Sequence, residues 1–250
     1  MCSSDLQRKM AEEQLRIYAD RLERSNRELT DFASIAAHDL QEPLRKIQAF
    51  GDRLTTRYGQ SLPEEGLDYL SRMLVSAGRM RKLIDDLLAY SRVATQAKPF
   101  VPTSLGEVLA EVLSDLELSI EQVGGKVDLG ALPTIDADPS QMRQLFQNLL
   151  GNALKFHKKN EPPVVKIGAN TGNGLCTILV EDKGIGFDEK YLDKIFTIFQ
   201  RLHGRQEYEG TGVGLAVCRR IVERHGGSIT ARSKTGEGAC FIVSLPLKHT

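Results

Sequence analysis

Apolar positions in the first part of the chain follow the spacing of long helices. Between residues 15 and 36 the seam positions recur in alternating steps of three and four, and they are Leu15, Tyr18, Leu22, Ser25, Leu29, Phe32 and Ala36. This spacing places them along one side of a helix, with acidic and basic residues mostly off the seam. The pattern predicts a coiled-coil helix over residues 1–30, and past Ala36 the apolar positions shift to Leu40, Leu44 and Ile47.

A second helix is expected to fold back on the first. Gly59, Pro63 and Gly66 interrupt the pattern and predict a hairpin turn. The helix after the turn has an apolar face at helical spacing: Leu67, Leu70, Leu74, Ala77, Met80, Ile84, Leu87 and Leu88. An antiparallel hairpin over residues 31–92 would leave apolar surface on its far side. We therefore expect a homodimer in which two hairpins form a four-helix bundle.

The rest of the chain alternates between helical and strand-like segments. Residues 93–103, with Pro99 and Pro102, are predicted to be a linker. Helices are predicted at Leu105–Gln122, Pro139–His157 and Gly214–His225, and strands at Lys126–Leu132, Val164–Ala169, Leu175–Glu181, Ser228–Ser233 and Cys240–Leu245. The fold class is thus a helical hairpin followed, over residues 104–250, by an α/β sandwich with helices on one side of a sheet.

Composition removes several classes of function. Thirty-three basic residues balance thirty-three acidic ones, so no overall field recruits nucleic acid. The four cysteines form no C-x-x-C pair, which argues against a metal knuckle or a disulfide framework. No apolar run approaches the roughly 20 residues that span a bilayer. We expect a cytoplasmic chain with no direct membrane insertion, as it stands or as the cytoplasmic part of a larger sensor protein.

One predicted helix carries a polar face suited to a metal–phosphate complex. Asn148, Asn152 and Lys155 stand at i, i+4 and i+7 and so share one side of the helix. Amide oxygens are hard ligands of the kind Mg²⁺ accepts beside phosphate oxygens, and an ammonium pairs with phosphate. The alternative is an ordinary amphipathic helix with two polar asparagines.

Asp182, Gly184 and Gly186 directly follow an apolar strand. A carboxylate at a strand end could accept the amino group of adenine, while the glycines let backbone approach the ring closely. The same residues could also form a plain turn. A further glycine turn at Thr235–Gly238 is most simply a hairpin connection between the last two strands.

A second glycine-rich segment opens a helix, where free backbone N–H groups favour phosphate. Its residues are Gly210, Thr211, Gly212, Gly214 and Leu215. The pattern is neither a Walker loop nor a Rossmann fingerprint. Upstream, Gln200–Thr211 is predicted to be a lid, anchored by the packing of Phe196 and Phe199.

Together these motifs resemble the N, first-glycine, F and second-glycine boxes of the Bergerat-fold ATPases, and are most similar to those of sensor histidine kinases. The resemblance covers about residues 30–247. It implies ATP bound under a lid, with Asn148 and Asn152 holding Mg²⁺, Lys155 contacting phosphate and Asp182 holding adenine. Further contacts to ATP are implied for Gly184, Gly186, Gly210, Thr211, Gly212, Gly214 and Leu215.

The segment His38-Asp39-Leu-Gln-Glu42-Pro43-Leu44 resembles the phospho-acceptor box of these kinases, in the form attached to phytochromes and related sensory modules. With Ala36 and Leu40 facing inward, His38 should project into solvent, where a neutral imidazole is a nucleophile that Asp39 orients or deprotonates.

The resemblance implies that MgATP phosphorylates His38 and that the phosphate passes to an aspartate of a response regulator receiver domain, under an upstream sensor module. Many relatives have Thr or Asn where this chain has Glu42, a position linked to phosphatase activity, so weak phosphatase activity is expected.

Two other functions compete with the autokinase. A conformational ATPase, like the heat-shock chaperone or mismatch-repair relatives, would need a glutamate base near the position of Asn148 and gives His38 no task. A silent scaffold that binds receivers through the bundle would not need intact nucleotide motifs.

Overall fold

The computed structural model describes residues 13–14, 17–18, 35–96, 98–202, 204, 208 and 210–249. The chain divides into two compact units, Met1–Thr95 and Gln96–Thr250, and each is described by itself. The predicted coiled-coil helix of residues 1–30 lies almost wholly outside the described residues, as do parts of the predicted lid. Among the described residues, none of the helices combines the length and apolar character that crossing a bilayer demands.

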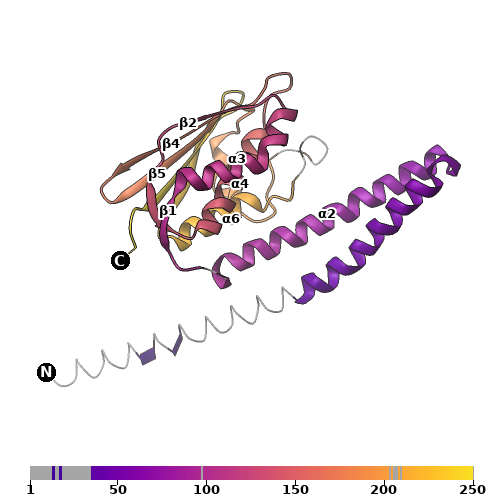
Figure 1. Ribbon diagram of the computed structural model, residues 1–250, viewed down its shortest axis with the longest axis horizontal. Helices are drawn as coiled ribbons and strands as arrows, with labels where there is room; N and C mark the ends of the chain where they lie inside the picture. Colours follow the sequence, from indigo (N-terminus) through magenta and orange to yellow (C-terminus); the bar gives the residue numbers. More distant parts are fainter. Residues whose placement is uncertain are drawn as a thin grey trace. The chain divides into compact units, whose positions relative to one another are not determined.

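The first unit contains an antiparallel helical hairpin (Figure 1). Residues 35–58 are helical, the 3-10 turn η1 (Gly59–Ser61) follows, and α2 (Glu64–Thr95) runs back. Polar side chains join the two helices, since Gln41 Nε2 donates to Asp85 Oδ1 (2.6 Å) and Arg81 Nη1 donates to Gln48 Oε1 (2.8 Å). The predicted turn and second helix are therefore confirmed.

Within a single hairpin, Leu40 of the predicted inward seam is 56% exposed, whereas Ala37 and Leu44 are buried. The seven-residue step from Ala37 to Leu44 continues to Gly51, where an added Cβ would stand 2.3 Å from Leu74 Cδ2. Ala37, Leu44 and Gly51 therefore face the second helix of the hairpin, and Leu40 lies outside this contact.

The second unit is built on a mixed five-stranded sheet. Its strand order is β2 (Lys126–Leu129), β4 (Val164–Gly172), β5 (Leu175–Asp182), β7 (Gly238–Pro246) and β6 (Ser228–Lys234). β2 pairs parallel with β4 and the other pairs are antiparallel. Alternate residues of β5 (Cys176, Ile178 and Val180) are buried, as expected for strands covered on one face.

Three helices cover that face of the sheet (Figure 1): α3 (Leu105–Gln122), α4 (Pro139–Lys155) and α6 (Gly214–Arg224). Their apolar sides form the core with the strands, and its largest fully buried members include Leu105, Leu109, Met142, Leu145, Phe146, Leu149, Ile178, Ile221 and Leu245. The short elements η2 (Glu189–Tyr191) and α5 (Leu192–Ile195) precede the predicted lid. The predicted α/β sandwich is confirmed.

The segment predicted as a linker is shorter than expected. α2 continues to Thr95, and a strand, β1 (Val101–Ser104), begins inside the predicted span. β1 pairs antiparallel with β3 (Thr134–Ala137) in a separate two-stranded sheet, in which Pro102 stands opposite Asp136. Proline is tolerated in a two-stranded ribbon because both strands are edges, so Pro102 gave a misleading loop signal.

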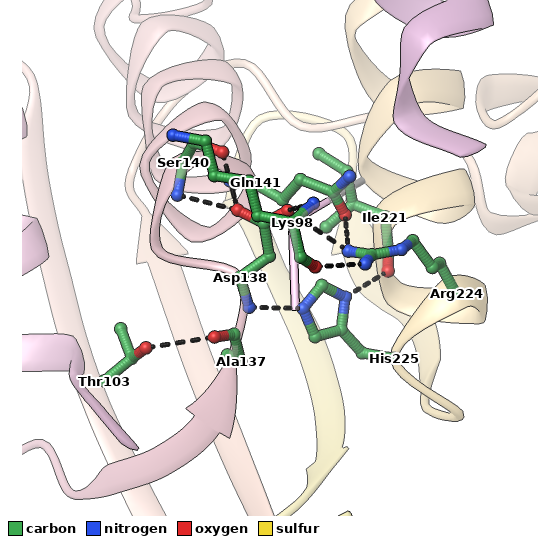
Figure 2. Close-up of polar contacts among 9 residues, drawn as sticks. All are labelled: Lys98, Thr103, Ala137, Asp138, Ser140, Gln141, Ile221, Arg224 and His225. Atoms are coloured by element: carbon green, nitrogen blue, oxygen red, sulfur yellow. Dashed lines mark hydrogen bonds and ion pairs between the residues drawn. The ribbon is translucent and has the colours of Figure 1, made fainter. Parts of the chain in front are cut away.

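Asp138 and His225 tie the start of α4 to the end of α6 (Figure 2). The fully buried Asp138 carboxylate accepts from the amides of Ser140 (3.0 Å) and Gln141 (3.3 Å), which caps α4. Burial alone would raise the pKa of Asp138, but hydrogen bonds from the Ser140 hydroxyl and from the amides of Lys98 and Gln141 lower it, as does the charge of Arg224. His225 Nδ1 donates to Ile221 O (2.7 Å) and its Nε2 accepts from the Asp138 amide (3.1 Å), which fixes a neutral tautomer.

His225 should make the stability of the protein sensitive to acid. Burial, opposed by the hydrogen bond to Ile221 O, lowers the pKa of His225 below 6.5. As the pH falls below about 6.5, the unfolded chain binds a proton at His225 before the folded chain does, so the free energy of unfolding falls, by at most about 1.4 kcal/mol per pH unit. Urea unfolding followed by circular dichroism should show a shallower slope for His225→Gln. His38→Gln, which removes an exposed ring, is the control, and equal slopes for His225→Gln and wild type would contradict the prediction.

Candidate functional site

The polar residues predicted to hold a metal and phosphate lie on the partly exposed side of α4. Asn148, Asn152 and Lys155 are half-buried, while Leu149 and Leu150 on the other side are fully buried. The helix begins at Pro139 behind its Asp138 cap and ends when Phe156 leaves helical geometry. Core packing on one side therefore fixes where the amides and the ammonium emerge.

The second-glycine motif lies directly against these α4 side chains. An added Cβ on Gly214 would stand 3.0 Å from Asn148 Oδ1, and one on Gly210 would stand 2.9 Å from Lys155 Nζ. Gly214 opens α6, and Val213 at the N-cap has no side-chain oxygen to cap the first amides. The helix start therefore presents backbone N–H groups next to an amide oxygen, in the arrangement that favours an anion.

Asp182 lies at the end of β5 in the turn of the first-glycine motif. Its Oδ1 accepts from the amides of Gly184 (2.8 Å) and Ala239 (3.3 Å). Burial raises the pKa of Asp182, against the effect of these hydrogen bonds. Gly184 is required because a Cβ there would stand 2.3 Å from Phe156 O, and that same carbonyl accepts from the Ile185 amide (2.9 Å). The turn is thus joined to the C-terminal end of α4.

The turn between β6 and β7 supports the first-glycine motif from behind, which confirms it as a hairpin connection. The amide of Gly236 donates to Ile185 O (2.7 Å). A Cβ on Gly186, whose φ is +59°, would stand 2.2 Å from Lys234 O, and one on Gly238 would stand 2.1 Å from Asp182 O. Only glycine allows the two turns to approach this closely.

The described part of the lid segment is held by hydrogen bonds to backbone carbonyls rather than by the packing of both phenylalanines. Phe196 is buried, as predicted, but Phe199 is 53% exposed with φ of +64°, so the prediction that it anchors by packing is wrong. The Phe199 amide donates instead to Gly212 O (3.0 Å), and Arg201 Nη1 donates to Gly210 O (2.6 Å). The left-handed backbone at Phe199, which a hydrophobic pattern cannot predict, turns the ring toward solvent.

An aromatic ring lies beside the ammonium of Lys155. Its Nζ stands 3.9 Å from the centroid of the Phe156 ring, and the Tyr208 ring lies 5.1 Å from that of Phe156. A cation over an aromatic face is attracted by the ring. The sequence analysis did not identify Tyr208, since a lone tyrosine in a polar loop carries no signal.

A divalent metal at this site would be held by few protein ligands. Among the described residues, no three His, Cys, Asp or Glu side chains are grouped to hold a metal ion. The hard donors that the cluster offers are the amide oxygens of Asn148 and Asn152. This donor set fits Mg²⁺, which keeps water and phosphate oxygens in its shell, better than a metal that requires a full protein cage.

His38 lies on the helix of residues 35–58, in the first unit. Its ring is 79% exposed, and Nδ1 stands 3.4 Å from Asp39 Oδ1. The carboxylate of Glu42, on the same helix, forms an ion pair with Lys46 Nζ (2.7 Å), and this contact lowers the pKa of Glu42. The predicted solvent-facing imidazole with a neighbouring carboxylate is therefore present.

Both units match known domains. Residues 28–96 match the His Kinase A (phospho-acceptor) domain, and residues 137–249 match the histidine kinase-, DNA gyrase B- and HSP90-like ATPase. The phytochrome-like protein Cph1 of Synechocystis sp. is 41% identical over 235 residues, which cover 94% of this chain and 31% of Cph1. The chain thus spans about a third of that relative's length.

Solved structures share the fold. Full-length ShkA in complex with AMPPNP aligns with a TM-score of 0.66 at 24% identity, over 88% of this chain and 46% of ShkA. Histidine kinase ThkA in complex with the response regulator protein TrrA aligns with a TM-score of 0.62 at 22% identity, over 93% of this chain and 67% of ThkA.

The two matches define a phospho-acceptor domain followed by an ATPase domain. The chain belongs to the histidine kinases, and among curated proteins it is similar to phytochrome-like members of that family.

The close approach of the turns predicts a sharp difference between two glycines. Gly186→Ala should destabilise the protein by about 1–3 kcal/mol, because its Cβ would collide with the Lys234 carbonyl in a left-handed backbone. Gly168→Ala on β4 meets no atom within 4 Å and is the control. Urea unfolding measures both, and equal stabilities would show that the turns relax at no cost.

Proposed function

We propose that the chain is the catalytic core of a sensor histidine kinase that uses MgATP to phosphorylate its own His38. The proposal is supported most directly by the convergence of Asn148 and Lys155 with Gly214 and Gly210, because one helix face and one glycine-rich helix start thereby form a single cluster of phosphate-binding groups. ShkA, whose fold is similar, was solved in complex with AMPPNP, which agrees with it.

Each residue of the cluster has a role that follows from its chemistry. The amide oxygens of Asn148 and Asn152 would hold Mg²⁺, which when bound neutralises charge on the phosphates. Lys155 would add a point charge to the same phosphates, and the first amides of α6 after Gly214 would donate to them. Asp182, half-buried at the end of β5, would accept the adenine amino group.

The remaining glycines and neighbours of the two loops, Gly184, Gly186, Gly210, Thr211, Gly212 and Leu215, would line the nucleotide with backbone. Phosphoryl transfer requires little covalent chemistry from protein, so positioning and charge neutralisation are the main contributions.

His38 would act as the nucleophile through its outer nitrogen. In the tautomer in which Nδ1–H donates a hydrogen bond to Asp39, the lone pair is on Nε2, on the other side of the ring. Attack of Nε2 on the γ-phosphorus would form the N–P bond, break the bond to the β-bridging oxygen and release ADP. Asp39 is suited to stabilise the charge that develops on the ring.

The competing conformational ATPase finds less support. It would need a carboxylate base in place of Asn148, and it leaves the exposed His38 without a task.

The partners proposed for this core follow the same logic. The phosphate on His38 would pass to an aspartate of a response regulator receiver domain, a class of partner that ThkA binds. Because the chain matches about a third of Cph1, an upstream sensor module and a cytoplasmic setting are part of the proposal. Glu42 stands where many relatives have Thr or Asn, and it pairs with Lys46. We therefore still predict weak phosphatase activity.

Labelling with ATP tests the proposed function. Incubation with γ-labelled ATP and Mg²⁺ should give an acid-labile, base-stable label on wild type and none above background on His38→Ala. The variant should keep its affinity for nucleotide within about twofold, because His38 lies outside the ATPase unit. ATP hydrolysis without protein label would instead favour the conformational ATPase.

Dimerisation is the other testable part of the proposal. Large apolar side chains stay exposed at seven-residue spacing on both helices of the hairpin: Leu40, Ile47 and Leu54, and Met73, Met80 and Leu87. Two hairpins would bury these rows against each other. Ile47→Glu should weaken the dimer about tenfold or more by burying an unpaired charge, as measured by sedimentation equilibrium. Thr56→Glu adds the same charge away from these rows and should leave the dimer intact, whereas a stable Ile47→Glu dimer would exclude this face.

A further inference from the structure

The segment that follows α2 is hydrogen-bonded to side chains of the ATPase unit three residues after the helix ends. The backbone amide of Lys98 donates to Asp138 Oδ2 (2.9 Å), and the Lys98 carbonyl accepts from Arg224 Nη2 (2.6 Å) (Figure 2). Both backbone groups of one residue are thus bound by side chains of the ATPase unit. This contact lies before β1, in a stretch where no regular secondary structure would hold the chain.

Phe100 adds an apolar contact to the same segment. Arg224 Cζ lies 4.6 Å from the centroid of the Phe100 ring. The centroids of the His225 and His249 rings lie 4.6 Å and 4.0 Å from the same centroid. The guanidinium and the two imidazoles thus surround the phenyl ring. We name the segment Lys98–Phe100 with its partners Asp138 and Arg224 the linker latch.

Arg224 holds the linker latch together. Besides the Lys98 carbonyl, its guanidinium donates to Gln141 Oε1 (2.8 Å) and Asp138 Oδ2 (3.3 Å). Its side chain is only 19% exposed and that of Asp138 is fully buried. A planar fork of donors can bind a carbonyl, an amide oxygen and a carboxylate together, which a lysine ammonium does less well.

The linker latch sets the length of free chain between the two units. With it closed, two residues, 96 and 97, separate the end of α2 at Thr95 from Lys98. With it open, the next fixed point is β1 at Val101, and five residues are free. Three residue steps join Thr95 to Lys98 and six join Thr95 to Val101, so at about 3.5 Å per step opening would increase the reach from about 10 Å to about 21 Å.

His38 lies back along the hairpin from the end of α2. The hydrogen bond between Gln41 and Asp85 sets the register, which places His38 level with about Leu88, seven residues before Thr95. At 1.5 Å per residue this is about 10 Å along the helix, which uses the whole of the closed reach but only about half of the open reach.

We propose that the linker latch restrains the ATPase unit, and that its opening lengthens the tether and speeds transfer of phosphate to His38. This inference rests on the proposed autokinase function. Neither Arg224 nor Phe100 is assigned a contact with nucleotide or with His38, although Arg224 also contacts Asp138 and Gln141 at the start of α4.

Two variants open the linker latch in different ways. Arg224→Gln removes the fork and Phe100→Ala removes the ring that it covers. Each should raise the initial rate of His38 labelling at saturating MgATP by about threefold or more, with the apparent affinity for ATP within about twofold of wild type. The double variant should be no faster than the faster single variant, because both changes open the same contact.

Arg219→Gln is the matched control on α6. It removes the same charge from an exposed pair with Glu223 and should label at the wild-type rate. Hydrogen exchange gives a second readout that does not depend on activity. The amide of Lys98 should exchange at least tenfold faster in both variants and at the wild-type rate in Arg219→Gln. Should Arg224→Gln fail to fold by circular dichroism, Phe100→Ala alone decides.

Two results would overturn the proposal. One is an unchanged or reduced labelling rate in a folded variant whose Lys98 amide exchanges rapidly. The other is unchanged exchange of that amide in both variants. If the wild-type chain takes no label on His38, the proposed function itself fails, and the exchange experiment still reports on the contact.

Discussion

The arrangement of the ATPase unit depends on α4 being held at both ends. At its start the Asp138 carboxylate caps the helix, and the Asp138 amide donates to His225 at the end of α6. At its other end the carbonyl of Phe156 accepts from Ile185 in the first-glycine turn. A helix fixed in this way has no freedom to rotate about its axis, so Asn148 and Lys155 keep one orientation relative to the turns they face.

The turns themselves are positioned by the absence of side chains. A Cβ on Gly184, Gly186 or Gly238 would come within 2.1–2.3 Å of a backbone carbonyl, which no side chain could relieve because backbone cannot rotate out of the way. The glycines predicted to admit a nucleotide therefore also bring β5, α4 and the β6–β7 turn into contact. Glycine at these positions thus serves both the fold and the proposed nucleotide site, so a substitution would affect stability and nucleotide binding together.

The sequence predicted those parts of the structure that depend on local pattern. The bounds of α3 were predicted without error, and those of α6 to within one residue, because a strong apolar period and glycine boundaries mark them. β1 was missed because Pro102 signals a loop unless its partner strand is known. Phe199 was placed wrongly because a left-handed backbone is not visible in the hydrophobic pattern. The exposure of Leu40 within one hairpin likewise depends on how closely the two helices pack.

The hydrogen bonds of each histidine ring determine whether it has a nitrogen lone pair available for reaction. His225 uses both ring nitrogens inside the fold, one as donor to Ile221 O and one as acceptor from the Asp138 amide, so it has no lone pair to offer a phosphorus atom. His157 commits Nδ1 to the carbonyl of Leu154. His38 has an adjacent carboxylate, Asp39, 3.4 Å from Nδ1, and its ring is 79% exposed. A nucleophile on an exposed helix requires a separate unit to deliver the phosphate, since the groups suited to bind nucleotide lie on α4, β5 and α6. The length of chain that joins the two units is therefore a property of the reaction as much as of the fold, and the side chains that hold the linker belong to the same mechanism.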